Sequence, residues 1–150
     1  MSDIDTLVII PTYNEIENIE KMTTAVLDSS PHVDILFVDD NSPDGTGKLA
    51  DELSEKFDRV HVMHRTAKEG LGRAYIAGFK WALERDYAYV MEMDCDFSHD
   101  PKEIPNFRNK IIAGHDLVLG SRYVNGVRVL NWPMSRLMLS RGAGVYVKII

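Results

Sequence analysis

The sequence predicts an α/β fold in which a mostly parallel sheet is covered by helices on both faces. Apolar runs of strand length alternate along the chain with segments whose apolar residues recur at helical spacing. Parallel neighbouring strands need a crossover connection, and helices between them provide it. The chain has 150 residues, 45% of them hydrophobic and 27% charged, as expected for one globular domain with its own core. We therefore expect residues 1–150 to form a single domain of this class.

Five apolar runs have the length and composition of β-strands. Because helical segments separate them, we expect the five strands to pair in parallel. The runs are residues 7–10, 35–38, 60–63, 87–93 and 117–119.

The first two helices are predicted from their end signals. Asn14 and Glu17 have the spacing of a capping pair, and the helix that they begin should reach about Ser29, because Pro31 follows. The second helix should begin at Thr46, where a Gly-x-Gly-x-x-Ala pattern follows three aspartates. Those carboxylates would oppose a bound pyrophosphate, so we interpret the pattern as a turn and a helix start.

The third and fourth helices follow from apolar periodicity and from breakers. Residues 71–85 should form the third, and Gly78 on its apolar face would let it lie close to the sheet. The fourth should run from Pro101 to about Gly114. After residue 120 we expect a loop and then a basic, apolar helix from about Pro133. The face of the third helix consists of Leu71, Ala74, Tyr75, Gly78 and Ala82.

Charge is divided unevenly along the chain. The net charge is −6, yet no acidic residue follows Asp116, and the last 34 residues carry +5. The earlier part could therefore hold a cation and the tail could meet an anion. Nucleic acid is not favoured as a partner, because most of the chain is negative and the basic tail has little aromatic interleaving.

Cysteine content and hydropathy indicate a cellular location. The single cysteine, Cys95, cannot form an internal disulfide, which favours the reducing cytosol. No apolar run approaches the roughly 18 residues that a membrane-spanning helix needs. We expect a cytoplasmic protein with possible peripheral membrane contact through its C-terminal helix.

The residues that follow the predicted strands are mostly acidic. Ligands of open parallel sheets bind beyond the carboxyl ends of the strands, so these residues are the candidates for a site. Carboxylates that converge there from three strands repel one another unless a cation lies among them. The segments are residues 11–15, 39–44, 94–100 and 120–123.

Asp94 and Asp96 are the best candidates to hold that cation. They are two residues apart, so in an extended backbone both side chains point the same way. Mg²⁺ or Mn²⁺ binds carboxylate oxygens and keeps positions open for diphosphate oxygens. Between them, Cys95 should have a raised thiol pKa and serve packing rather than nucleophilic chemistry.

Five motifs in order along nearly the whole chain resemble the inverting GT-A glycosyltransferases of family 2. Among them the likeness is greatest to the polyprenyl-phosphate (dolichol-phosphate) mannosyltransferases. The resemblance implies a GT-A, Rossmann-like fold, GDP-mannose as donor, a polyprenyl phosphate as acceptor, and Mg²⁺ or Mn²⁺ as cofactor. The motifs are residues 10–15 (IPTYNE), 38–46 (VDDNSPDGT), 68–72 (KEGLG), 93–101 (MDCDFSHDP) and 120–123 (GSRY).

The resemblance also implies roles for single residues. Asp94 and Cys95 would follow the diphosphate, and Asp96 would be the main metal ligand. Ser98 stands where some members have a glutamine ligand, and Cys95 stands where alanine is usual. The residues that would line the nucleotide pocket are Pro11, Tyr13, Glu15, Val38 and Asp40.

The acceptor chemistry can be argued from charge. A lipid phosphate is already largely dianionic at pH 7, since its second pKa is about 6, so it needs cations rather than a general base. Arginine provides paired donors that suit phosphate. By resemblance, Arg122 and Arg136 would hold the acceptor phosphate and join Asp94 and Asp96 in the catalytic set.

Several alternatives stay open at this point. Family members continue for a further C-terminal segment, so the chain could be a donor-binding module without turnover, or it could use another donor or acceptor. A receiver domain would carry its Asp pair after the first strand, whereas Asp39 and Asp40 follow the second. A phosphatase with Asp94 as nucleophile would carry that motif early in the chain.

Overall fold

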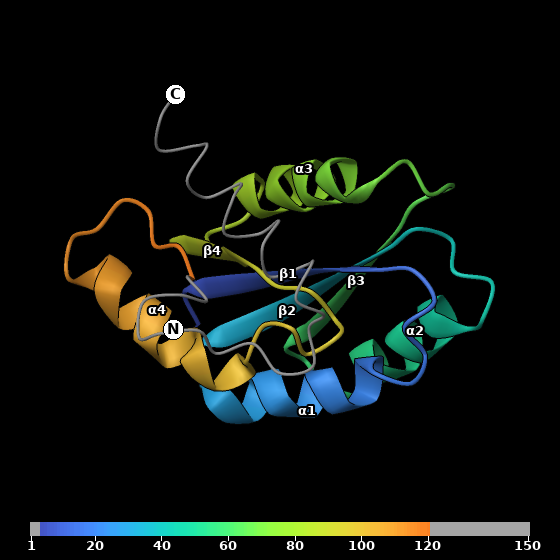
Figure 1. Cartoon of the computed structure of the whole chain (residues 1–150), viewed down its shortest axis with the longest axis horizontal. Helices are drawn as coiled ribbons and strands as arrows, with labels where there is room; N and C mark the ends of the chain where they lie inside the picture. Colours follow the sequence, from blue (N-terminus) through green and yellow to red (C-terminus); the bar gives the residue numbers. More distant parts are fainter. Residues whose placement is uncertain (1–3, 121–150) are drawn as a thin grey trace, which may run out of the picture. The chain divides into compact units, whose positions relative to one another are not determined.

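The computed structural model describes residues 4–120, and these contain a four-stranded parallel sheet with helices on both faces (Figure 1). Almost all of them belong to one compact unit that ends at Val118. Arg122, Arg136 and the helix expected from Pro133 lie outside the described residues.

The elements alternate between strand and helix as far as α4. The strand order is β3-β2-β1-β4, so β1 lies inside the sheet and β4 pairs with β1 alone among the described strands. The strands are β1 (Thr6–Thr12), β2 (Val33–Asp39), β3 (Val60–His64) and β4 (Tyr89–Glu92). The helices are α1 (Ile19–Ser29), α2 (Thr46–Lys56), α3 (Leu71–Leu83), the 3₁₀ turn η1 (Pro101–Glu103) and α4 (Ile104–Ile112).

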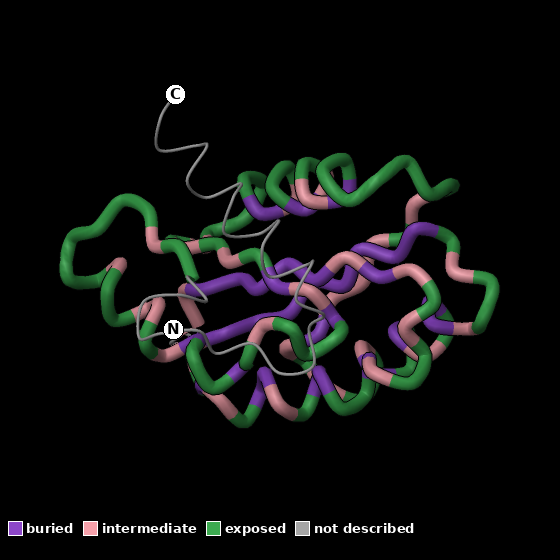
Figure 2. The backbone as a smooth tube through the Cα atoms, viewed as in Figure 1, coloured by how far each residue is buried: buried purple, intermediate pink, exposed green. Residues whose placement is uncertain are grey.

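The two inner strands are buried on both faces, as Figure 2 shows. Successive side chains of a strand point to opposite faces, so β1 contributes to two cores. Val8 and Ile10 pack in the core that α1, α2 and α4 cover. Leu7 and Ile9 pack in the core beneath α3. This two-sided burial explains why these strands appear in the sequence as continuous apolar runs.

Helix α3 lies very close to the sheet because its inner face is small. A Cβ atom added at Gly78 would stand 2.6 Å from Cγ2 of Ile9, and Ala74 and Ala82 are buried on either side. The close approach predicted for Gly78 is therefore confirmed. Leu71, expected on the same face, is 57% exposed instead, because it lies in the first turn of the helix, before the part that covers the sheet.

The start of the first helix differs from the prediction. The helix begins at Ile19, and Asn14 has a left-handed backbone with φ of 61°. The backbone N–H of Asn14 donates to Oγ of Ser42 at 3.1 Å, and that of Glu15 donates to Oγ1 of Thr46 at 2.9 Å. These tertiary bonds replace the capping pair that the spacing predicted.

The fifth predicted strand is also wrong. Residues 117–119 pair with no strand of the described sheet, and Leu117 and Leu119 are 74% and 78% exposed. An apolar run becomes a strand only where a neighbouring strand satisfies its backbone groups. The fourth strand is shorter than residues 87–93, and the fourth helix, predicted from Pro101, begins with the 3₁₀ turn η1 before α4 starts at Ile104. The remaining ends agree within two residues with the prediction.

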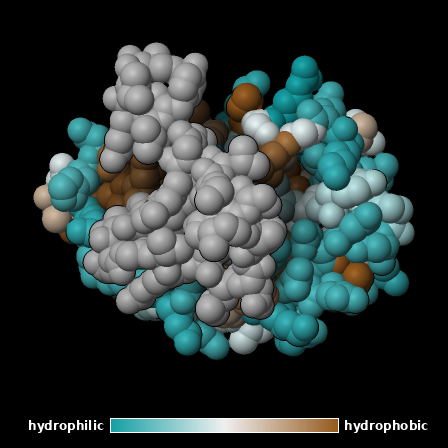
Figure 3. Space-filling view, in the orientation of Figure 1, coloured by the Kyte–Doolittle hydropathy of each residue, from teal (hydrophilic) through white to brown (hydrophobic). Residues whose placement is uncertain are grey.

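Hydrophobic side chains gather on the outer surface of α3. Figure 3 shows hydrophobic surface near this helix, whereas the side of α1 and α2 is mostly hydrophilic. The exposed side chains include Ile76, Phe79 and Leu83. Within residues 4–120, no helix is long and apolar enough to cross a membrane.

Candidate functional site

The loops after β1, β2 and β4 meet beyond the carboxyl edge of the sheet, where the sequence places its acidic residues. Each loop contains one non-glycine residue with positive φ, a conformation that is uncommon and that surrounding contacts must hold in place. Within residues 4–120 no other non-glycine residue has it. The three are Asn14 (61°), Asn41 (57°) and Phe97 (60°).

Asp39 fastens the first two loops together. Its carboxylate is buried, and Oδ1 accepts hydrogen bonds from the hydroxyls of Thr12 at 3.1 Å and Ser42 at 2.6 Å. Oδ2 accepts the backbone N–H of Ser42 at 3.0 Å. Both oxygens accept hydrogen bonds from the protein, so Asp39 holds the two loops together at the site.

Asp44 links the same two loops through a second set of hydrogen bonds. Its oxygens accept hydrogen bonds from the hydroxyl of Thr46 at 2.6 Å, the backbone N–H of Thr46 at 3.0 Å and that of Ile16 at 3.2 Å. Desolvation works to raise the pKa of Asp44, but the hydrogen bonds from Thr46 and Ile16 outweigh it and lower the pKa below its ordinary value. The carboxylate therefore stays ionised.

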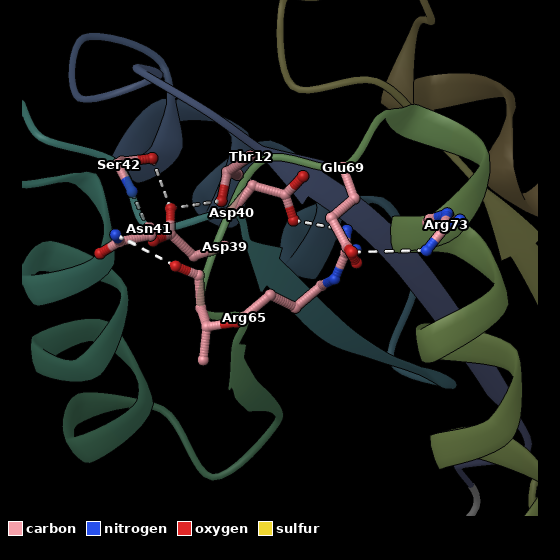
Figure 4. A network of polar contacts seen from close by, with 9 residues as sticks. Thr12, Asp39, Asp40, Asn41, Ser42, Arg65, Glu69 and Arg73 are labelled. Atoms are coloured by element: carbon pink, nitrogen blue, oxygen red, sulfur yellow. Dashed lines mark hydrogen bonds and ion pairs between the residues drawn. The ribbon is translucent and has the colours of Figure 1, made fainter.

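Asp40 is the buried carboxylate of the predicted nucleotide pocket. It is 5% exposed, and its Oδ1 accepts a hydrogen bond of 2.7 Å from Nη1 of Arg65. Nη2 of Arg65 donates to Glu69 at 2.7 Å, and Glu69 also pairs with Arg73. Figure 4 shows Arg65 lying between Asp40 and Glu69, so that the network extends from the end of β2 to the start of α3.

The segment after β4 turns sharply. Met93 still bonds to β1, but the chain turns at Cys95 and Asp96, so the extended backbone expected for Asp94 and Asp96 is wrong. Cys95 is 3% exposed and packs in the core. Burial, with further contributions from Glu15, Asp96 and Asp94, raises the pKa of its thiol to about 12. The packing role predicted for Cys95 is confirmed.

Asp94 is held by one side chain from α3 and by one from its own motif. The hydroxyl of Tyr75 on α3 donates to Oδ1 of Asp94 at 3.2 Å. The backbone N–H of Asp94 donates to Nδ1 of His99 at 3.2 Å. Burial, together with the negative charge of Asp94, raises the pKa of the Tyr75 hydroxyl, so Tyr75 remains a donor at neutral pH.

Asp96 is the exposed carboxylate of the site. Its Oδ1 accepts the backbone N–H of Ser98 at 2.9 Å. Desolvation opposes ionisation, but hydrogen bonds from Ser98 and the nearby His99 outweigh it and lower the pKa of Asp96. An ionised oxygen ligand beside a serine hydroxyl suits Mg²⁺ or Mn²⁺, which bind proteins through one or two carboxylates and take further oxygens from water and phosphate. Within residues 4–120 no group of three His, Cys, Asp or Glu residues could enclose a metal.

The other predicted pocket residues differ in accessibility. Pro11, Tyr13 and Glu15 are half-buried at the carboxyl end of β1, and Glu15 is close enough to Cys95 to affect its pKa. Nζ of Lys68 lies 3.8 Å from the centroid of the Tyr13 ring, a cation–π contact. Val38 has no exposed surface and packs in the core beneath α3.

In the loop after β3, sequence reasoning recognised residues 68–72 as a motif but gave no role to Lys68, and it missed Arg65. It considered the residues after the other strands because those are acidic. A signal was available, because Arg65 directly follows His64 at the carboxyl end of β3, and a cation there faces the carboxylates of the neighbouring strand. Tyr75 was assigned only to the apolar face of its helix.

Comparisons with known proteins agree with this arrangement. A family model described as glycosyl transferase family 2 matches residues 7–148. Polyprenol monophosphomannose synthase of Mycolicibacterium smegmatis is 56% identical over 146 residues, which cover 97% of this chain and 55% of that protein. Undecaprenyl-phosphate mannosyltransferase of Micrococcus luteus is 49% identical over 144 residues, covering 96% of this chain and 59% of that protein. The chain thus spans somewhat more than half the length of these two relatives.

A solved structure extends the likeness to the fold. The crystal structure of S. aureus TarS 1-349 superposes with a TM-score of 0.62 at 23% identity, over 85% of this chain and 39% of that one. The α/β fold of the GT-A class expected from the sequence is confirmed.

Proposed function

The chain belongs to glycosyl transferase family 2, and from this premise we propose that residues 1–150 form the nucleotide-sugar-binding domain of an inverting mannosyltransferase. The proposed donor is GDP-mannose, and the proposed acceptor is a polyprenyl phosphate. The relatives at 56% and 49% identity, named for polyprenol and undecaprenyl-phosphate mannosyl transfer, support this choice. Because that acceptor is a lipid, we place the reaction at a membrane surface facing the cytoplasm.

The different environments of three carboxylates carry the proposal. Asp40 is buried and paired with a cation, as suits a group that binds a neutral base. Asp96 is exposed and ionised, as suits a ligand of a metal–diphosphate. Asp94 precedes Asp96 by two residues, and its carboxylate accepts a hydrogen bond from the hydroxyl of Tyr75. One edge of the sheet therefore offers separate places for the base and for the diphosphate of a nucleotide.

We assign the remaining roles from the resemblance to the family and from charge. Asp96 and Ser98 would hold the metal ion, which when bound stabilises negative charge on the departing diphosphate. Pro11, Tyr13, Glu15, Asp40 and the backbone near Cys95 would bind the nucleotide. A phosphate oxygen of the acceptor forms a bond to the anomeric carbon of mannose while the bond from that carbon to the diphosphate breaks, so GDP leaves and the configuration inverts. Arg122 and Arg136 would hold the acceptor phosphate.

Titration with nucleotides tests the donor site. We expect the chain to bind GDP more tightly than UDP, and to do so only with Mn²⁺ or Mg²⁺ present. Asp96→Asn replaces an anionic ligand by a neutral amide of the same shape, so it should abolish the metal-dependent binding of GDP and leave the fold intact. Asp86→Asn, an exposed carboxylate in the connection from α3 to β4, is the matched control and should bind like the wild type. Unchanged metal dependence in Asp96→Asn would remove Asp96 from the site.

Transfer assays test the reaction. Mannose transfer from GDP-mannose to a short polyprenyl phosphate would be measured on the chain, and on a hybrid that continues with the C-terminal segment of the M. smegmatis relative. Replacing Arg122 and Arg136 by Gln should abolish transfer in the hybrid while GDP binding persists. GDP binding without transfer in both proteins would instead identify a donor-binding module.

A further inference from the structure

We propose that Arg65 is a positioning residue of the nucleotide site, which holds the Asp40 carboxylate in an orientation that faces the base. The inference rests on the proposed function, in which Asp40 contacts the base. Arg65 contributes through Asp40 rather than through its own contact with the nucleotide. The loop that carries it, residues 65–70, becomes part of the donor site.

The geometry of the pair leaves one oxygen of Asp40 for a ligand. Oδ1 accepts the hydrogen bond from Nη1 of Arg65 at 2.7 Å. Within residues 4–120, Oδ2 receives no hydrogen bond, although Asp40 is only 5% exposed. Among the described residues, Oδ1 of Asp34 is the only fully buried side-chain oxygen or nitrogen without a hydrogen-bond partner, so Oδ2 of Asp40 keeps accessible surface. The N–H groups of a base are donors that this oxygen could accept. Fixing Oδ1 therefore determines where Oδ2 points.

The positive charge of Arg65 contributes to the pair as well as the direction of its hydrogen bond to Asp40. The side chains of Arg65 and Asp40 are 11% and 7% exposed, so each is largely removed from water. A carboxylate that is removed from water needs a partner of opposite charge, and Arg65 is that partner for Asp40. The planar guanidinium gives Oδ1 of Asp40 a charge-assisted hydrogen bond of fixed direction.

The backbone of Arg65 is fixed independently of its side chain. Its N–H donates to the carbonyl of Asp39 at 2.8 Å. The side-chain amide of Asn41 donates to the carbonyl of Thr66 at 3.4 Å. A substitution at Arg65 therefore leaves the loop attached to the end of β2, and it tests the guanidinium alone. The same loop brings Lys68 onto the ring of Tyr13, so it reaches two residues of the proposed pocket.

The test is a double-mutant cycle on GDP affinity in the presence of Mn²⁺, with Arg65→Met, Asp40→Asn and the double variant. Arg65→Met should weaken GDP binding about ten-fold or more in the wild-type background, the range for a lost hydrogen bond to a charged group. In the Asp40→Asn background the same change should have an effect of less than about two-fold, because the carboxylate that Arg65 orients is gone. Arg65→Lys keeps the charge and should restore part of the affinity.

Arg59→Met is the matched control. Arg59 is also half-buried, but it donates to the backbone carbonyls of Ser30, Val33 and Leu27 near the opposite end of β2. It should lower the thermal stability and leave GDP affinity unchanged in both backgrounds. Melting curves of all variants verify that each is folded.

The outcomes separate the inference from the proposed function. If Asp40→Asn binds GDP like the wild type, the base-binding role of Asp40 is wrong, and the inference fails with it. If Asp40→Asn weakens binding but Arg65→Met does not, only the inference fails. An equal loss from Arg65→Met in both backgrounds would show that Arg65 acts independently of Asp40, which also overturns it.

Discussion

At the residue scale, burial decides which groups of the site are reactive. Cys95 lies between two aspartates, of which Asp96 is exposed, yet its own side chain is 3% exposed. The thiolate is the reactive form of cysteine, and the pKa of this thiol is raised to about 12. The turn after β4 thus contains an unreactive thiol, that of Cys95, next to an ionised carboxylate, that of Asp96.

This contrast gives a prediction for Cys95. At pH 8 the folded chain should react with a thiol-specific disulfide reagent far more slowly than the chain in denaturant, since almost no thiolate forms in the folded state. Absorbance at the wavelength of the released thiol measures the rate. Glutathione in the same buffer is the control for reagent activity. A fast stoichiometric reaction of the folded protein would contradict the burial of Cys95.

At the scale of elements, the contact between α3 and β1 allows a matched pair of substitutions. Gly78→Ala would place a Cβ atom 2.6 Å from Ile9, whereas Gly72 in the first turns of the same helix has no atom within 4 Å of such a Cβ. Gly78→Ala should lower the free energy of unfolding by about 1 to 3 kcal/mol through overpacking. Gly72→Ala should raise it by about 0.5 to 1 kcal/mol, because alanine is the better helix former.

Urea unfolding at neutral pH measures both changes. Adding Ile9→Val to Gly78→Ala removes a methyl group from the crowded side chain, so it should recover part of the lost stability. Equal effects of the two alanine substitutions would mean that α3 does not lie against Ile9 as described.

Elements also show what the sequence alone can predict. β1 and β2 were predictable because burial on both faces requires continuous apolar runs, and the small face of α3 was predictable from its periodicity. The start of α1 was not, because the left-handed backbone of Asn14 depends on Ser42, which is 28 residues away in the chain. Likewise, the position of Arg65 after β3 was a signal, but the sequence does not show that Arg65 lies beside Asp40, which follows the neighbouring strand.

At the scale of the whole described unit, an ion pair joins its two ends. Nε of Arg108 in α4 donates to Oδ1 of Asp5 at 2.9 Å, across 103 residues of sequence. Hydrogen bonding to Arg108 lowers the pKa of Asp5 below its ordinary value of 3.8, although burial opposes this. The pair therefore stabilises the fold fully above about pH 3.8, and this contribution is lost as the pH falls through the lower pKa of the folded state.

Arg108→Gln should remove this pH-dependent contribution. We expect a loss on the order of 1 kcal/mol at pH 7 and a smaller loss near pH 2, measured by thermal or urea unfolding across that range. Glu52→Gln breaks the exposed pair of Lys48 and Glu52 and should change stability by less than about 0.5 kcal/mol. A loss in Arg108→Gln that is constant from pH 2 to pH 7 would contradict the ionic role of the pair.

The order of the strands has a consequence for the way in which the protein folds. β1 pairs with β2, where Thr6 lies opposite Val33, and with β4, where Thr6 lies opposite Tyr89. The chain between β1 and β4 is much longer than the chain between β1 and β2, so pairing β1 with β4 costs more chain entropy. The β1–β2 pair should therefore form first during folding, and β4 should pair later. Asp40 follows β2 and would reach its place in the site when β2 pairs, whereas Asp94 and Asp96 would do so only when β4 pairs. Recovery of nucleotide affinity during refolding would therefore report the final docking step rather than the initial collapse.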